Sequence, residues 1–242
     1  PLARNLYWTW KPDVRALFRR LDPEAWEACG HNPVALLRDV SQARLDEAAR
    51  DDAYCALVAQ ADEAFQAYLN APRRDRCGAE ESDLYAYFCA EYGWNEGMAL
   101  YSGGLGVLSG DHTKAASDLG VPLVGVGLWY PEGYFHQRIA SDGSQEAIYV
   151  RNDAAEMPLE AVVDENGERI VVHVHTFGRD VAVQAWRSDV GRVPVYLLDT
   201  DREDNEPQDR ALLARLYGGD QRTRIAQEMI LGIAIPRIIS WA

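Results

Sequence analysis

The chain has 242 residues, of which 48% are hydrophobic and 26% are charged, a composition typical of a globular protein that buries a sizeable core. Most of its net charge of −14 falls on residues 81–242, where 13 Lys and Arg face 25 Asp and Glu. Such acidity repels phosphate backbones and anionic lipids, which argues against nucleic-acid and membrane partners and is compatible with a neutral ligand such as a carbohydrate.

Hydropathy and the start of the sequence predict a cytoplasmic protein. No run of about 18 apolar residues occurs, which is the length that a membrane-spanning helix needs. The first residues, PLARNLYWTWKPD, lack the basic, apolar and small-residue order of a signal peptide.

The first third of the chain contains helix signals. The segments PDVRALFRRL and PEAWEACG begin on Pro12 and Pro23, as helices often do, and apolar residues then continue at helical spacing. Pro72 and the charged run RRDRCGAEESD interrupt this pattern. We interpret the run as a linker between a helical extension, residues 1–78, and a second domain, residues 79–242.

Beyond the linker, strand and helix signals alternate. LYAYFCAEY and VPLVGVGLWY predict strands that are buried on both faces, and SGDHTKAASDLG predicts a helix between them that ends at Gly120. This order is the βαβ unit of a parallel sheet. EGYFHQRI, ERIVVHVHTF and DVAVQAWRS alternate with period two and predict an antiparallel or mixed insertion, whereas VPVYLLDT returns to the buried pattern. We therefore expect an α/β fold.

The C-terminal part predicts two helices. PQDRALLARL predicts the first, Gly218 and Gly219 a turn, and the following residues a long helix that Pro236 interrupts.

A glycine cluster lies between the first predicted strand and its helix. Gly103, Gly104 and Gly106 indicate either a tight turn or a backbone that another group approaches closely. In a βαβ unit, ligands bind beyond the carboxyl ends of the strands, where the amides of a helix N-terminus favour anions. The cluster matches neither the dinucleotide pattern GxGxxG nor the ending GK[ST] of a nucleotide loop. Its spacing alone leaves both interpretations open.

Some polar side chains allow a chemical or a structural interpretation. His173 and His175 lie on one side of a predicted strand without a third ligand nearby, so we expect them to face solvent and predict no metal site. Asp111 and His112 are expected at a helix start, where the carboxylate would cap the helix.

Glu91 and Glu96 precede the glycine cluster, where they could bind sugar hydroxyls or order the loop, and the sequence leaves both roles open. Among the aromatic residues, Trp129 and Tyr130 at a strand end are candidates to stack on a sugar. In contrast, we expect the tryptophans of the helical part in its core, namely Trp8, Trp10 and Trp26.

Residues 87–139, YFCAEYGWNEGMALYSGGLGVLSGDHTKAASDLGVPLVGVGLWYPEGYFHQRI, resemble the N-terminal domain of bacterial α-glucan phosphorylases. The resemblance extends to the helical N-terminal segment and to RLYGGDQRTRIAQEMILGI, so it covers nearly the whole chain. It implies the Rossmann-like N-terminal half of a two-domain glycosyltransferase of the GT-B type. It also implies that the full-length enzyme uses inorganic phosphate to cleave terminal α-1,4-linked glucose from glycogen or maltodextrin, which releases glucose 1-phosphate, with pyridoxal phosphate as cofactor.

The resemblance assigns roles to four residues. It implies that the amides of Gly103 and Gly104 face phosphate groups, that the Leu105 amide faces the sugar, and that Asp220 lies on a gating loop near the substrate. The family's Schiff-base lysine, phosphate-binding basic residues and catalytic histidine lie outside this sequence. We therefore expect the chain to be inactive without a C-terminal domain that supplies them, and a homo-oligomer is compatible with the resemblance.

Two alternatives remain at this stage. A glycogen or starch synthase also contains GGLG, but usually places a lysine two residues before the first glycine, where this chain has Tyr101. The chain could instead be a non-catalytic carbohydrate-binding module.

Overall fold

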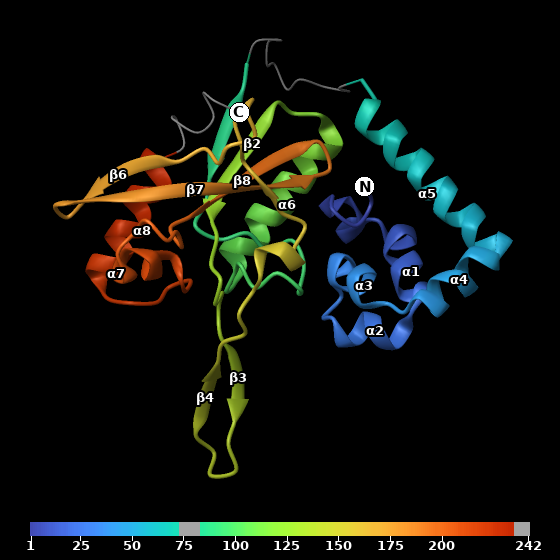
Figure 1. Ribbon diagram of the computed structural model, residues 1–242, viewed down its shortest axis with the longest axis horizontal. Helices are drawn as coiled ribbons and strands as arrows, with labels where there is room; N and C mark the ends of the chain where they lie inside the picture. The colour runs from blue at the N-terminus through green and yellow to red at the C-terminus, as the bar shows by residue number, and fades with distance from the viewer. Residues whose placement is uncertain (73–82, 235–242) are drawn as a thin grey trace.

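The computed structural model describes residues 1–72 and 83–234 (Figure 1). Most of the predicted linker, with the expected boundary after residue 78, and the predicted break at Pro236 lie outside these residues. The first described range is helical and contains η1 (Leu6–Trp10), α1 (Pro12–Leu21), α2 (Pro23–Ala28), α3 (Pro33–Asp39), α4 (Gln42–Arg50) and α5 (Asp52–Asn70).

Short polar side chains divide this helical part. The side chain of Asp22 accepts a hydrogen bond from the Ala25 N–H at the start of α2, and Asn32, Ser41 and Asp51 cap α3, α4 and α5 in the same way. The apolar spacing that predicts continuous helix therefore extends over three separate helices, because each cap begins a new one.

The second range folds around a mixed sheet. Its elements are β1 (Tyr85–Phe88), α6 (Gly104–Leu119), β2 (Leu123–Leu128), β3 (His136–Ile139), β4 (Gln145–Ile148), η2 (Ala154–Glu156), β5 (Glu160–Ala161), β6 (Val172–Thr176), β7 (Arg179–Val190), β8 (Val193–Asp199), α7 (Pro207–Arg210), η3 (Ala211–Leu213) and α8 (Gln221–Ile233). The strand order is β1-β2-β8-β7-β5, and β6 also pairs with β7. β1, β2 and β8 are parallel to one another, whereas β5, β6 and β7 pair antiparallel.

The predicted βαβ unit is confirmed by the parallel pairing of β1 and β2, with α6 between them in sequence. β2 is buried along its whole length, as its sequence predicts. The same prediction is wrong for β1, in which Tyr85 and Phe88 are exposed, because β1 lies at the edge of the described sheet. Gly120 ends α6 in the left-handed conformation, with φ 72°, as predicted.

Helices cover both faces of the sheet. Figure 1 shows α6 on one side and α8 on the other, while the β3–β4 hairpin extends away from the rest of the molecule. The helix predicted from PQDRALLARL is much shorter than expected, since α7 has four residues and η3 follows directly. No helix among the described residues has both the length and the apolar character to cross a bilayer.

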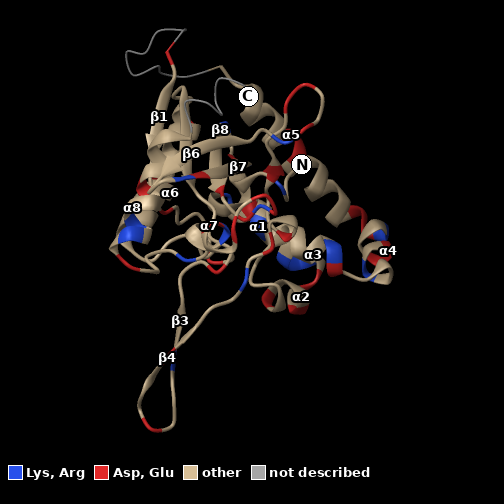
Figure 2. Ribbon diagram, turned by 60° about the vertical axis from the view of Figure 1, so that its left-hand side comes forward, with Lys and Arg blue, Asp and Glu red and all other residues tan. Residues whose placement is uncertain are grey.

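The buried side chains form two hydrophobic clusters. One lies in the helical part around Trp8, Phe18 and Trp26, and the other surrounds the sheet. Trp10 packs against both, and the Asn5 side chain donates to the Gly191 carbonyl at 2.9 Å and accepts from its amide at 2.8 Å. The helical part is thus joined to the sheet by packing and by buried hydrogen bonds. Acidic residues lie on both parts (Figure 2).

Candidate functional site

The glycine cluster lies beyond the carboxyl end of β1, the edge at which parallel sheets hold ligands. The structure corrects the sequence prediction in one respect, because α6 begins at Gly104 within the cluster rather than after it. Gly103 is the N-cap residue and provides no side-chain hydrogen bond. Consequently, Gly104 and Gly106 belong to the first turn of a 16-residue helix.

The glycines of this cluster serve two different purposes. A Cβ on Gly106 would lie 2.3 Å from the Cβ of Tyr101, so this position needs glycine for packing. A Cβ on Gly103 or Gly104 would meet no atom within 4 Å, and neither residue has a positive φ that would require glycine. Internal packing therefore explains Gly106, whereas the missing side chains at Gly103 and Gly104 leave the backbone open to an external group.

The first amides of α6 are available to such a group. The hydrogen bonds of the described residues give no acceptor to the N–H of Gly104, Leu105 or Gly106, and Leu105 is 50% exposed. Unpaired amides at a helix N-terminus carry a partial positive charge and favour anions. The arrangement can therefore stabilise negative charge on a ligand without any basic side chain.

The buried carboxylate of Glu91 holds the backbone at the start of the glycine cluster. Its side chain is only 2% exposed, and its Oε2 accepts hydrogen bonds from the amides of Ser102 at 2.7 Å and Gly103 at 3.4 Å. Its other oxygen, Oε1, accepts from the hydroxyl of Tyr217. Of the two roles that the sequence leaves open for Glu91, the structure supports loop ordering.

Tyr217 connects the glycine cluster to the turn before α8. It has a left-handed backbone with φ 58°, and the guanidinium of Arg224 lies 4.8 Å from its ring centre. The hydrogen bond to Glu91, together with burial, raises the pKa of Tyr217 to about 12. Sequence reasoning did not single out Tyr217, and its only signal was the position next to Gly218, Gly219 and Asp220.

Asp220 caps α8. Its carboxylate accepts from the amide of Thr223 at 2.8 Å and from the hydroxyl at 2.9 Å, and these bonds lower its pKa. The side chain is exposed. The structure therefore links the two segments that contain predicted site residues, 103–105 and 220, through the Glu91–Tyr217 hydrogen bond.

Two sets of predicted side chains occupy other places than expected. Trp129 and Tyr130 are 3% and 1% exposed, and the Tyr130 hydroxyl donates to the Ala90 carbonyl at 2.9 Å. They belong to the core and cannot stack on a sugar in this structure. Asp111 and His112 lie in the middle of α6, because the helix begins at Gly104, so they cap no helix start.

The remaining aromatic and histidine predictions hold in most respects. Trp8 and Trp26 are buried as expected, whereas Trp10 is half-buried and donates to Asp118. His173 and His175 are exposed on β6, as predicted. Within residues 1–72 and 83–234, no group of three or more His, Cys, Asp or Glu side chains could hold a metal ion.

Both lysines are engaged elsewhere. The Lys11 ammonium lies 3.7 Å from the Asp118 carboxylate. Lys114 donates to the Trp94 carbonyl at 2.9 Å, and burial lowers its pKa. Neither ammonium therefore offers a free amine to a group bound at the first turn of α6.

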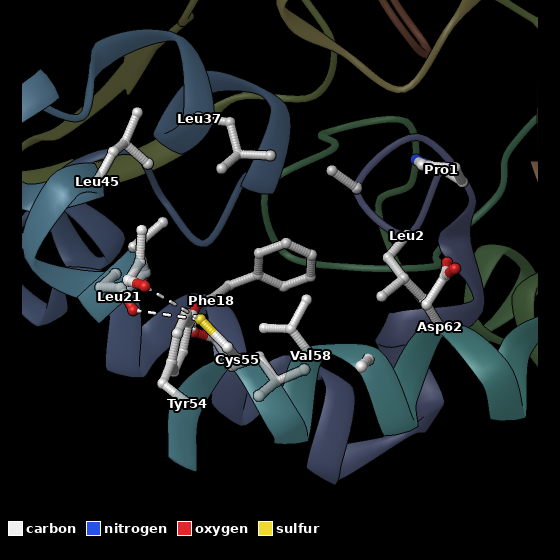
Figure 3. Close-up of a pocket in the computed structure, with 15 residues that line it drawn as sticks. Pro1, Leu2, Phe18, Leu21, Leu37, Leu45, Tyr54, Cys55, Val58 and Asp62 are labelled. Carbon is white, nitrogen blue, oxygen red and sulfur yellow. Dashed lines mark hydrogen bonds between the residues drawn. The ribbon is translucent and has the colours of Figure 1, made fainter. Parts of the chain in front are cut away.

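An open apolar cavity of about 630 Å³ lies in the helical part, well away in sequence from the glycine cluster (Figure 3). Phe18, Leu45 and Val58 point into it from α1, α4 and α5. Its lining is almost entirely apolar, so it offers few hydrogen-bonding groups to a sugar or phosphate.

Comparisons with known proteins agree with the sequence resemblance. A family model described as "Protein of unknown function (DUF3417)" matches residues 1–98. Glycogen phosphorylase of Mycobacterium tuberculosis is 43% identical over 98% of this chain, maltodextrin phosphorylase of Thermococcus litoralis 39% over 98%, and glycogen phosphorylase of Aquifex aeolicus 36% over 96%. The chain spans 28%, 29% and 33% of the length of these three relatives. Over nearly its whole length, the chain is therefore homologous to the N-terminal part of α-glucan phosphorylases.

Proposed function

We propose that this chain forms one wall of the substrate site of an α-glucan phosphorylase. The proposed enzyme transfers the terminal α-1,4-linked glucose of glycogen or maltodextrin to inorganic phosphate and releases glucose 1-phosphate. The observation that supports this most strongly is the pair of open glycines, Gly103 and Gly104, at the unpaired amides of α6.

The resemblance to the family suggests a division of roles among these residues. The Gly104 amide would face the phosphate and the Leu105 amide the sugar. The resemblance gives the Gly103 amide to the phosphate as well, but that amide donates to Glu91, so Gly103 would contribute by leaving the approach open. Because the α6 dipole points its positive end toward the same place, it would stabilise negative charge on phosphate as the glycosidic bond breaks. Glu91 would keep these amides in position, and Asp220 would border the site from the turn before α8.

The remaining chemistry would belong to polypeptide outside residues 1–242. We propose a GT-B arrangement in which residues 79–242 form a Rossmann-like domain, residues 1–78 a helical extension, and a further C-terminal domain the opposite wall. The α/β sheet with its parallel β1, β2 and β8 supports this. We also propose a cytoplasmic location.

We also propose that the enzyme uses pyridoxal phosphate, which would be covalently attached to the C-terminal domain. The unpaired amides at the start of α6 fit a phosphate group, but the described residues do not fit the covalent attachment. Lys11 pairs with Asp118 and Lys114 donates to a carbonyl, so neither matches a Schiff-base lysine.

A chimeric enzyme tests the proposal. This chain would replace the matching N-terminal part of the Mycobacterium tuberculosis glycogen phosphorylase, and release of glucose 1-phosphate from maltodextrin would be measured. Gly104→Val should abolish phosphorolysis, because its side chain occupies the approach to the amides, while the fold persists. Gly232→Val in α8, where a Cβ also meets no atom within 4 Å, is the matched control and should remain active. Full activity of the Gly104→Val chimera would refute the assignment.

A further inference from the structure

The helical extension contacts a short segment that leads from β1 toward the glycine cluster, residues 91–98. Arg15 on α1 donates to Oε1 of Glu96 at 2.5 Å, and Nδ1 of His31 lies 2.7 Å from the same oxygen. Packing accompanies these polar contacts, because a Cβ on Gly97 would lie 2.7 Å from the Gly30 carbonyl oxygen. The extension therefore holds this segment by charge and by close backbone approach.

The same segment holds the glycine cluster from its other side. The Gly93 amide donates to the Gly106 carbonyl at 2.7 Å. A Cβ on Gly110 of α6 would lie 2.2 Å from the Gly93 carbonyl oxygen, so helix and segment are in tight contact. Glu91, at the start of the segment, accepts from the amides of Ser102 and Gly103. A displacement of the segment would therefore displace the first turn of α6.

His31 lies between two carboxylates. Its Nε2 lies 2.9 Å from a Glu27 carboxylate oxygen, and its Nδ1 faces Glu96. The Arg15 guanidinium also lies 3.3 Å from Nδ1, so Arg15, His31 and Glu96 form one contact network between the extension and the segment. A left-handed turn aims the ring, since Gly30 and His31 have φ values of 62° and 61°, and the ring stacks on Trp26 at 5.2 Å.

We propose that the helical extension positions the glycine cluster, and that it does so through the contacts of Arg15 and His31 with Glu96. The matched range described above, residues 1–98, ends just beyond Gly97 and so includes the extension together with the segment it contacts. The inference depends on the proposed function only for what the loop binds. The positioning itself is a property of this chain.

Hydrogen exchange of this chain, without any ligand, tests the inference. The readouts are the protection factors of the Ser102 and Gly103 amides, with amides of β8 as a measure of global stability. Glu96→Gln removes the charge that Arg15 and His31 share, and should lower protection at Ser102 and Gly103 by about fivefold while β8 is unaffected. Glu27→Gln is the matched control, because it removes the other carboxylate at His31 but lies on the extension itself, and should leave both amides unchanged.

A second variant removes the same contact from the side of His31, so that an effect specific to Glu96 can be recognised. His31→Asn keeps a residue type that tolerates the left-handed backbone but is too short to hold Glu96, and it should lower protection at the same two amides. Unchanged protection at Ser102 and Gly103 in both variants would overturn the proposal. An equal fall in β8 would also overturn it, because that result describes general stability rather than positioning. Since no substrate is present, a failure of the proposed function would leave these results untouched.

Discussion

Replacing Glu91 by Gln should weaken the hydrogen bonds that hold the glycine cluster without changing the side-chain volume. Glu91 is buried, and its carboxylate accepts from the Ser102 amide at 2.7 Å and from the Tyr217 hydroxyl. A hydrogen bond to a charged group contributes about 1.5–3 kcal/mol, against about 0.5–1.5 kcal/mol for a neutral pair. Glutamine has one carbonyl oxygen, which can accept from the Ser102 amide, and an NH2 group, which can donate to the Tyr217 hydroxyl, so two charged hydrogen bonds become neutral ones and each loses about 1 kcal/mol. The free energy of unfolding should therefore fall by at most about 2 kcal/mol, because glutamine also removes the cost of burying a charged group.

Two assays follow this change in the free chain. Urea denaturation reports the free energy of unfolding, and nuclear magnetic resonance of ring-labelled tyrosine follows the ionisation of Tyr217, whose signal Tyr217→Phe identifies. The hydrogen bond to Glu91 is the largest cause of the raised Tyr217 pKa, so Glu91→Gln should move that pKa from about 12 back toward 10.0. An unchanged Tyr217 pKa together with unchanged stability would refute the role assigned to Glu91.

Two further predictions concern the same region. Gly106→Ala should destabilise the chain by about 1–3 kcal/mol in urea denaturation, because its Cβ would clash with Tyr101, whereas Gly103→Ala should be nearly neutral. Equal stability of the two variants would contradict the packing explanation. Partial burial opposes ionisation of Glu96, but hydrogen bonds from its own amide, His31 and Arg15 outweigh it and lower its pKa. The contribution of ionised Glu96 to the free energy of unfolding is therefore complete above pH 4.5, its usual pKa, and is lost as the pH falls through the lowered pKa. Glu96→Gln should flatten this part of the curve of stability against pH. Identical acid profiles of the two proteins would contradict this.

The parts of the fold that local sequence determines were predicted well. Proline at the first helical position and glycine at the last turn mark α1, α2 and α6, and continuous apolar residues mark β2 and β8. The apolar run of β1 has the same appearance, yet this strand is largely exposed. Its burial depends on which elements lie next to it, and that information is not contained in the strand itself.

The site could be predicted only where its residues are consecutive. Gly103, Gly104 and Leu105 form one motif, and the structure places them together at the start of α6. In contrast, Glu91 and Tyr217 are 126 positions apart, and no local pattern indicates that they share a hydrogen bond. Trp129 likewise follows a strand, which is the position expected of a sugar-stacking residue, but packing between the sheet and its neighbours buries it.

A crystal structure of the chimeric phosphorylase with bound glucose 1-phosphate is the most direct test of the central claim, that the unpaired amides of Gly104 and Leu105 face the ligand. We predict a phosphate oxygen within about 3 Å of the amide nitrogen of Gly104 and a sugar oxygen at a similar distance from that of Leu105. A phosphate bound in the same enzyme while these amides face only solvent would contradict the account.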